Sequence, residues 1–246
     1  QMIVRNNITE VAYNAQTTVD AKHNILIDYK VTNNNDSKAM GTMLRRAKTI
    51  LKTNSFTALY DKGYHTGSEF EIANTLGIET MVAIPTVAAN SPNKDYNVEN
   101  FGYCRQSDFY TCPQGHKLTT NGRIHQAKTY LFKRYVTKAC KTCPVKPECS
   151  KAIYGKAIQR SQFQTLIDDN KKRINANKNL YRKRQQIVEH PYGTLKRQWG
   201  FSFVATKKTM ERASADIGFM MSAYNLRRII NIVGINTLKD WLERST

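Results

Sequence analysis

The chain has 246 residues, of which 40% are hydrophobic, and its formal net charge is +19 at pH 7. This hydrophobic content is enough for a packed core, in one large domain or two small ones, and argues against wholesale disorder. We expect no membrane span and no secretory leader, because no apolar run approaches the ~20 residues that cross a bilayer. So large a cationic excess favours a nucleic-acid partner over a merely cationic soluble protein or a membrane-surface role.

The sequence begins with strand patterns and a helix. Residues 11–19 and 25–31 predict a β-hairpin around the polar turn at 20–24. Apolar residues at helical spacing then predict a helix from Met40 to about residue 53. The polar loop before it, at 33–37, is expected to cap that helix, with Asp36 as the capping residue.

A second strand and helix alternation follows. Residues 56–60 predict a short strand, the capping-box pattern at 68–71 opens a helix, and Gly77 ends that helix. Residues 80–84 form the next buried-type strand. Strands and helices in this order predict an α/β fold, a mixed sheet with helices packed on it.

The composition of the chain changes twice. All five Cys fall between about 86 and 160, among many Asn, Pro, Gly and Thr, which indicates an inserted module between residues 1–85 and 161–246. The last part is helical, with one long basic helix over 165–190 and another over 207–233. Pro191 either kinks the first of these or begins a new helix.

Two carboxylates stand where a metal site is expected. Asp61 ends an apolar strand, and Glu189 lies far downstream in a basic helix. Metal-dependent phosphoryl transfer needs hard oxygen ligands that hold two Mg²⁺ ions roughly 3.5–4 Å apart. The plainer alternative is that Asp61 starts a turn and Glu189 pairs with a cation on a solvated face. Tyr181, Arg184 and Lys196 lie within reach of the Glu189 face and would hold a DNA backbone there.

Four of the cysteines have spacings typical of a metal site. Cys140 and Cys143 form a Cys-x-x-Cys pair, which is half of a tetrahedral thiolate site, and Cys112 with Cys149 would complete it. These four residues predict a structural Zn²⁺ site, with His116 as an alternate ligand. The alternative is four reduced, structural thiols.

At residues 13–20, 60–64 and 188–197, the chain resembles the bacterial insertion-sequence transposases of the DDE type. The resemblance implies a ribonuclease-H-like mixed sheet with flanking helices, interrupted by a small Cys-rich β insertion. It implies that Asp61 and Glu189 are the second and third catalytic acids. The family has a Tyr-Arg-Glu-Lys signature, which the residues Tyr181, Arg184, Glu189 and Lys196 resemble. The spacing from Arg to Glu is one residue longer in this chain than in that signature. Arg197, beside Lys196, joins the expected DNA contacts.

The same resemblance implies the reaction and its partners. These are cleavage and transfer of DNA strands with Mg²⁺ or Mn²⁺, double-stranded element ends and target DNA, a homodimer in the transposition complex, and a place in the bacterial cytoplasm at the nucleoid. Residues 1–10 contain no Asp, and Asp20 and Asp28 belong to the hairpin. We therefore expect the first acid upstream of Gln1 and a fragment that is a poor catalyst alone. The alternatives are a DNA-binding remnant and a related metal-dependent nuclease.

Overall fold

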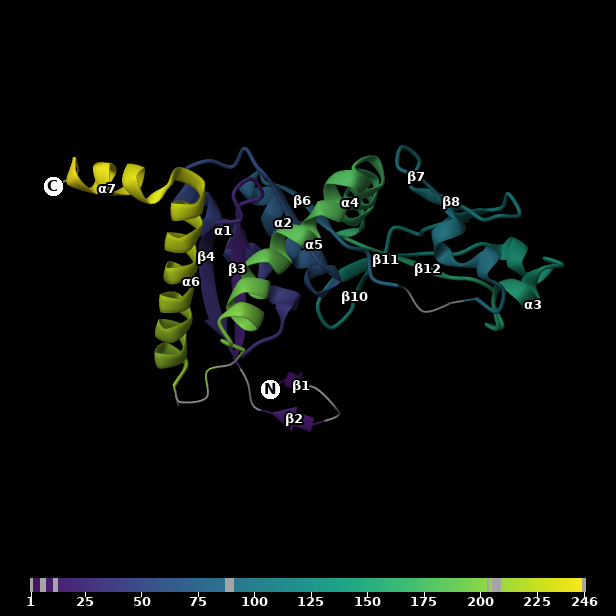
Figure 1. Cartoon of the computed structure of the whole chain (residues 1–246). Helices are drawn as coiled ribbons and strands as arrows, with labels where there is room; N and C mark the ends of the chain where they lie inside the picture. The colour runs from purple at the N-terminus through teal and green to yellow at the C-terminus, as the bar shows by residue number, and fades with distance from the viewer. Residues whose placement is uncertain are drawn as a thin grey trace. The chain divides into compact units, whose positions relative to one another are not determined.

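The computed structural model describes residues 2–4, 8–10, 13–86, 91–202, 204 and 209–244 (Figure 1). Two compact units make up the chain. The first, which we call the composite unit, combines Gln1–Ile84 with Asp168–Thr246, and the second, the inserted unit, is Pro85–Ile167. The inserted unit corresponds to the stretch in which the composition of the sequence changes.

The strands of the composite unit pair two by two. The pairs are β1 (Met2–Val4) with β2 (Ile8–Glu10), β3 (Asn14–Val19) with β4 (Leu26–Thr32), and β5 (Thr57–Tyr60) with β6 (Glu79–Val82). The first two pairs are antiparallel and the third is parallel. The β3–β4 pair confirms the predicted hairpin, whose first positions, 11 and 12, lie outside the described residues. The expected single mixed sheet is not formed, since these pairs remain separate two-stranded sheets in the part of the chain that the structure describes.

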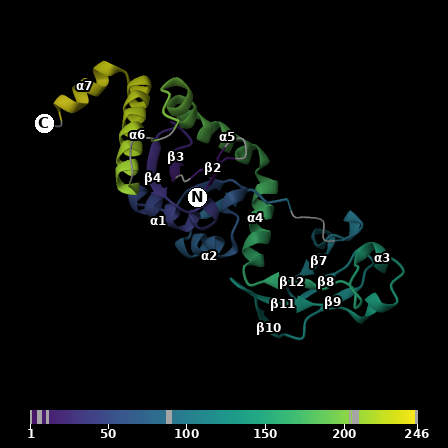
Figure 2. The same ribbon diagram turned by 90° about the horizontal axis from the view of Figure 1, so that it is seen from below.

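The composite unit also contains most of the helices. They are α1 (Met40–Leu51), α2 (Gly67–Leu76), most of α4 (Gln164–Ala176), α5 (Lys178–Gly193), α6 (Met210–Val233) and α7 (Ile235–Glu243). The β3–β4 hairpin lies between α1 and α2 on one side and α5 on the other (Figure 2). None of the described helices is long and apolar enough to cross a bilayer.

The long helix predicted over 165–190 is two helices. They meet at Asn177, whose backbone (φ −123°, ψ 38°) leaves the helical region. A new helix does not begin at Pro191, because α5 continues through this residue to Gly193 and then passes into a π-helix, η6 (Thr194–Gln198). Proline lacks a backbone N–H, and the wider hydrogen-bond pattern of a π turn is one way for a helix to absorb such a defect.

The capping box predicted at the start of α2 is wrong. Thr66 occupies the N-cap position, and it makes no side-chain hydrogen bond there. The Glu69 carboxylate is buried and accepts a hydrogen bond from the backbone N–H of Gly41 at 2.6 Å. Glu69 therefore joins α2 to the first turn of α1, so a tertiary contact replaces the local one.

Two asparagines attach the late helices to the early strands. On α4, the fully buried Asn170 accepts from the Val82 N–H at 2.8 Å and donates to the Val82 carbonyl at 2.9 Å. On α6, Asn225 makes the same pair of bonds with the backbone of Leu26, at 2.9 and 2.8 Å. Each side chain thus satisfies both backbone groups of one strand residue, as a neighbouring strand would.

Apolar packing completes the attachment of α6. Leu26, Leu195, Met221 and Tyr224 form a buried cluster that joins β4, η6 and α6. Gly218 allows the close approach of α6, since a Cβ at this position would lie 2.2 Å from the Tyr29 hydroxyl oxygen.

The inserted unit is built from two small antiparallel sheets. One contains β7 (Gly102–Cys104), β8 (Phe109–Thr111) and β9 (Lys117–Thr119), and the other β10 (Ile124–Gln126), β11 (Leu131–Tyr135) and β12 (Ile158–Ser161). A bridge between Thr119 and Val136 joins them. Their shared core is Phe101, Tyr110, Leu118, Tyr135 and Ile158, and the short helix α3 (Lys146–Cys149) lies between β11 and β12 in the chain.

Replacing Asn170 by Ala should lower the free energy of unfolding by roughly 2–4 kcal/mol, because the N–H and C=O of Val82 lose their partners. Urea unfolding followed by circular dichroism measures the change. Lys172→Ala on the same helix is the control. The Lys172 side chain is 80% exposed, and its ion pair with Asp169 is a long 3.5 Å contact. Equal stability of the two variants would contradict this role for Asn170.

Candidate functional site

Asp61 lies where β5 ends. Its carboxylate accepts a hydrogen bond from the Gly63 N–H at 2.8 Å and so caps the 3₁₀ turn η2 (Lys62–Tyr64). Asp61 therefore starts a turn, as the plainer interpretation of the sequence predicts. The carboxylate remains half-exposed, and one of its oxygens is committed to a single neutral donor.

A second aspartate lies beside Asp61. Asp36 opens the 3₁₀ turn η1 (Asp36–Lys38), which contacts η2. A Cβ built on Gly63 would be 3.0 Å from Asp61 Oδ1 and 3.3 Å from Asp36 Oδ2, so both carboxylates border the space that this glycine leaves. The interpretation of Asp36 as a helix cap is wrong, because Asn35 caps η1.

Two amides from β3 hold Asp36 in this orientation. Asn14 Nδ2 and Gln16 Nε2 each donate to Asp36 Oδ1 at 2.6 Å. The Tyr64 hydroxyl in turn donates to Gln16 Oε1, and the buried Gln16 thereby joins η2 to the strand. Burial raises the pKa of Tyr64, and the charges of Asp36 and Asp61 raise it further, so this hydroxyl stays protonated beside both acids.

Helix α5 is fixed to both parts of this site. The Tyr181 hydroxyl donates to the Tyr60 carbonyl at 2.7 Å, one residue before Asp61. Burial raises the pKa of Tyr181 and the Asp61 charge adds to the effect. Near the other end of the helix, the Tyr192 hydroxyl lies 3.0 Å from Thr17 Oγ1 and donates to the Ala15 carbonyl at 3.3 Å. The two tyrosines therefore lay α5 across the end of β5 and the middle of β3.

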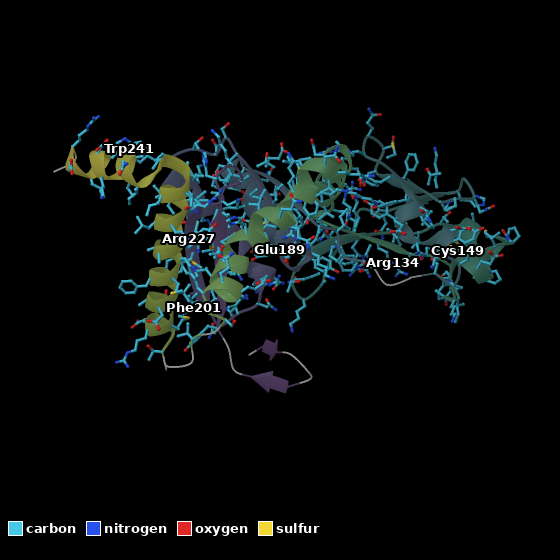
Figure 3. All side chains as sticks on the ribbon, viewed as in Figure 1. Arg134, Cys149, Glu189, Phe201, Arg227 and Trp241 are labelled. Atoms are coloured by element: carbon cyan, nitrogen blue, oxygen red, sulfur yellow. The ribbon has the colours of Figure 1, made fainter. Side chains whose placement is uncertain are left out.

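Glu189 lies between these two anchors. It is exposed on α5, and its carboxylate accepts a hydrogen bond from Gln185 at 2.8 Å (Figure 3). Along the helix axis, Glu189 lies about 4.5 Å, just under one turn, before Tyr192 and about 12 Å after Tyr181. No group of three His, Cys, Asp or Glu side chains in the described ranges is close enough to hold a metal ion as it stands.

The predicted basic contacts surround the same helix. The Arg184 guanidinium lies 5.8 Å from the centre of the Tyr181 ring, and Lys196 Nζ lies 5.2 Å from that of Tyr192. Lys196 and Arg197 are both exposed on η6. From 178 to 198 the sequence has one acid, Glu189, among the cations Lys178, Arg182, Lys183, Arg184, Lys196 and Arg197.

The four predicted zinc ligands meet in the inserted unit. Cys112, Cys140, Cys143 and Cys149 line one cavity of about 20 Å³, and all four are half-buried free thiols. Burial raises the pKa of the Cys149 thiol, Lys156 lowers it, and the other three cysteines raise it through their charges. His116 lines the same cavity, whereas Cys104, at the end of β7, does not.

Sequence reasoning missed Asp36 and Gln16. The signal that was available is Gln16 itself, a polar residue inside a strand pattern, which needs a polar partner once the strand is covered. Only the folded chain shows that this partner is an aspartate 20 residues away.

Residues 111–230 match the model of a protein family described as the transposase DDE domain. No curated protein and no solved structure matches the chain. The matched stretch includes Glu189 and the four cavity cysteines, and it begins after Asp36 and Asp61. This match supports a relationship of the chain to the DDE transposases.

Proposed function

We propose that the chain is the catalytic region of a transposase that cleaves and joins DNA strands in a metal-dependent reaction on a ribonuclease-H-like core. The observation that carries this proposal is the pair Asp36 and Asp61, whose oxygens border one small space beside the helix that bears Glu189. The match of residues 111–230 to the transposase DDE domain supports the reaction class.

The residues at this place suit a hard divalent cation. Carboxylate oxygens are the donors that Mg²⁺ and Mn²⁺ prefer, and the space at Gly63, which a Cβ would fill, lies within 3.3 Å of two of them. Asp36, Asp61 and Glu189 would hold the ions, although a third acid must come closer than it stands now. Bound there, Mg²⁺ supplies Lewis-acid stabilisation of the attacking and leaving oxygens.

The remaining residues position the substrate. Arg184, Lys196 and Arg197 bind phosphates of double-stranded DNA along α5 and η6, and the tyrosines fix the angle of that helix. Asn14 and Gln16 fix the direction of the Asp36 carboxylate through neutral hydrogen bonds, which leaves its negative charge for the cation. In the complete transposition complex, element ends and target DNA are the partners, and two copies of the chain act together.

The second candidate is a protein that binds DNA without cutting it. The observation that favours it is the exposed position of Glu189, whose carboxylate accepts a hydrogen bond from the Gln185 amide. A metal-dependent nuclease is the third candidate, which strand-joining assays separate from a transposase.

Asp61→Asn, Glu189→Gln and Asp36→Asn should each lower Mg²⁺-dependent cleavage of element-end DNA at least about 100-fold, because each removes a charged oxygen ligand. DNA binding in the absence of metal should be unchanged. Glu71→Gln, an exposed acid on α2, is the control. Full activity in Asp36→Asn would remove Asp36 from the site, and a wild-type protein that binds DNA but never cuts it would favour the second candidate.

Fe²⁺ in place of Mg²⁺, with peroxide, should cut the backbone near residues 36, 61 and 189, and Mg²⁺ should compete with this cleavage. Mass spectrometry of the fragments locates the cuts. This readout does not depend on strand transfer. Cuts at 36 and 61 without one near 189 would mean that Glu189 is not a ligand.

Arg184→Ala, Lys196→Ala and Arg197→Ala should each weaken DNA binding for all sequences and reduce the slope of log K against log salt by about 1. Fluorescence anisotropy over a range of salt concentrations measures both quantities. Lys239→Ala, exposed on α7, is the matched loss of one cation. If Lys239→Ala changes the slope as much as the other three, the charge effect is not local to α5 and η6.

A further inference from the structure

We propose that Cys112, Cys140, Cys143 and Cys149 bind one structural Zn²⁺, and that the buried Lys156 is the counter-ion of this centre. The proposal concerns the inserted unit alone and is independent of catalysis in the composite unit.

Three separate loops bring the four thiols together. Cys112 follows β8 in a tight turn, in which Gly115 N donates to the Cys112 carbonyl at 2.8 Å and Cys112 N donates to the His116 carbonyl at 2.9 Å. Cys140 lies in a 3₁₀ turn, η5 (Lys138–Lys141), and Cys149 ends α3. Between them, the Cys143 carbonyl accepts from Lys146 N at 3.1 Å. Backbone hydrogen bonds therefore define the turns that carry Cys112 and Cys143.

The loop at Gly155 and Lys156 lies in close contact with Cys140 in the cavity wall. Gly155 has φ +86°, and a Cβ on it would lie 2.2 Å from Cys140 Cβ and 2.8 Å from Cys140 Sγ. Only glycine allows the backbone to approach Cys140 so closely. The next residue in the chain is Lys156, so this approach also delivers a cation to the cavity wall.

The cavity has the size and the chemistry of a thiolate zinc site. Its volume of about 20 Å³ suits one ion or one water molecule and excludes an organic ligand. Zinc binds thiolates at about 2.3 Å in a tetrahedron, so the sulfurs must move closer together than they lie here, where no three of the described ligand side chains form a metal-binding group. All four cysteines are half-buried free thiols, and Cys112 and Cys149 also pack against the core of the inserted unit, so the donor set is held on a folded support.

Lys156 supplies the charge that such a centre needs. Four thiolates around Zn²⁺ carry a net charge of about −2, which is unfavourable in a largely buried place. Lys156 is 7% exposed, its ammonium donates to Ser91 Oγ at 2.6 Å, and it lines the same cavity as the four thiols. A buried cation beside buried thiols is explained if the thiols are ionised on a metal.

The full chain, purified under reducing conditions, should contain about one zinc per chain by elemental mass spectrometry. Co²⁺ titrated into the zinc-free chain should give the visible and charge-transfer absorption of a four-thiolate tetrahedral site, and Zn²⁺ should displace it. These two readouts need no variant. A chain that takes up neither ion would overturn the proposal, and a three-thiolate, one-nitrogen spectrum that His116→Ala changes would overturn the four-cysteine ligand set.

Variants then test each part. Cys112→Ser and Cys149→Ser should abolish the four-thiolate Co²⁺ spectrum, whereas Cys104→Ser, the fifth cysteine outside the cavity, should leave it unchanged. Lys156→Met should weaken zinc affinity about 10–100-fold, measured by competition with a chelator, and Lys156→Arg should restore part of the loss. Zinc affinity in Lys156→Met equal to that of the unaltered chain would overturn the counter-ion role.

Discussion

The composite unit depends on strand edges whose backbone groups are satisfied by helix side chains. Its parallel and antiparallel pairs have only two strands each, so every strand is an edge. Asn170 and Asn225 each bind both the N–H and the carbonyl of one edge residue, Val82 or Leu26. Val82 and Asn170 are 88 residues apart in the chain, and Leu26 and Asn225 are 199 residues apart. The inserted unit lies between the two members of each pair in the chain. Arg173 on α4 and Tyr224 on α6 add bonds to the carbonyls of Thr80 and Asn24, so several side chains share in fixing the register of these helices.

That register decides where α5 lies. Asn170 fixes α4 at β6, and Asn225 with the buried cluster fixes α6 and η6 at β4. Helix α5 runs between these two attachments, and its own tyrosines bind the backbone at the end of β5 and in β3. The two acids near Gly63 and the basic surface of α5 are thus held by separate bonds, so that a change in one does not displace the other.

The sequence predicts the local elements well, because hydrophobic period and glycine stops act over a few residues. The hairpin, α1, β5 and the αL stop at Gly77 follow from such patterns. Three features escaped, two of them because the side chain bonds to a distant partner. Glu69 bonds to Gly41 and not to its own helix end, Asp36 bonds to Gln16 and not to a helix, and Asn177 breaks a continuous helical pattern. In the candidate site, Asp61 and Tyr181 could be found by motif, while Asp36 required the fold.

The electrostatics of the Asp36 and Asp61 pair support the cation that we propose there. In a chain of net charge +19, two carboxylates border one small space. They nevertheless accept hydrogen bonds from neutral groups, the amides of Asn14 and Gln16 and the backbone N–H of Gly63. Neutral donors orient carboxylates without cancelling their charge, so the two repel each other more strongly the less water screens them. An arginine in this place would pair with the acids and close the space. The proposed divalent cation would offset the repulsion and leave coordination positions for phosphate oxygens, while the nearby arginines and lysines of α5 and η6 would stay available to the proposed DNA backbone.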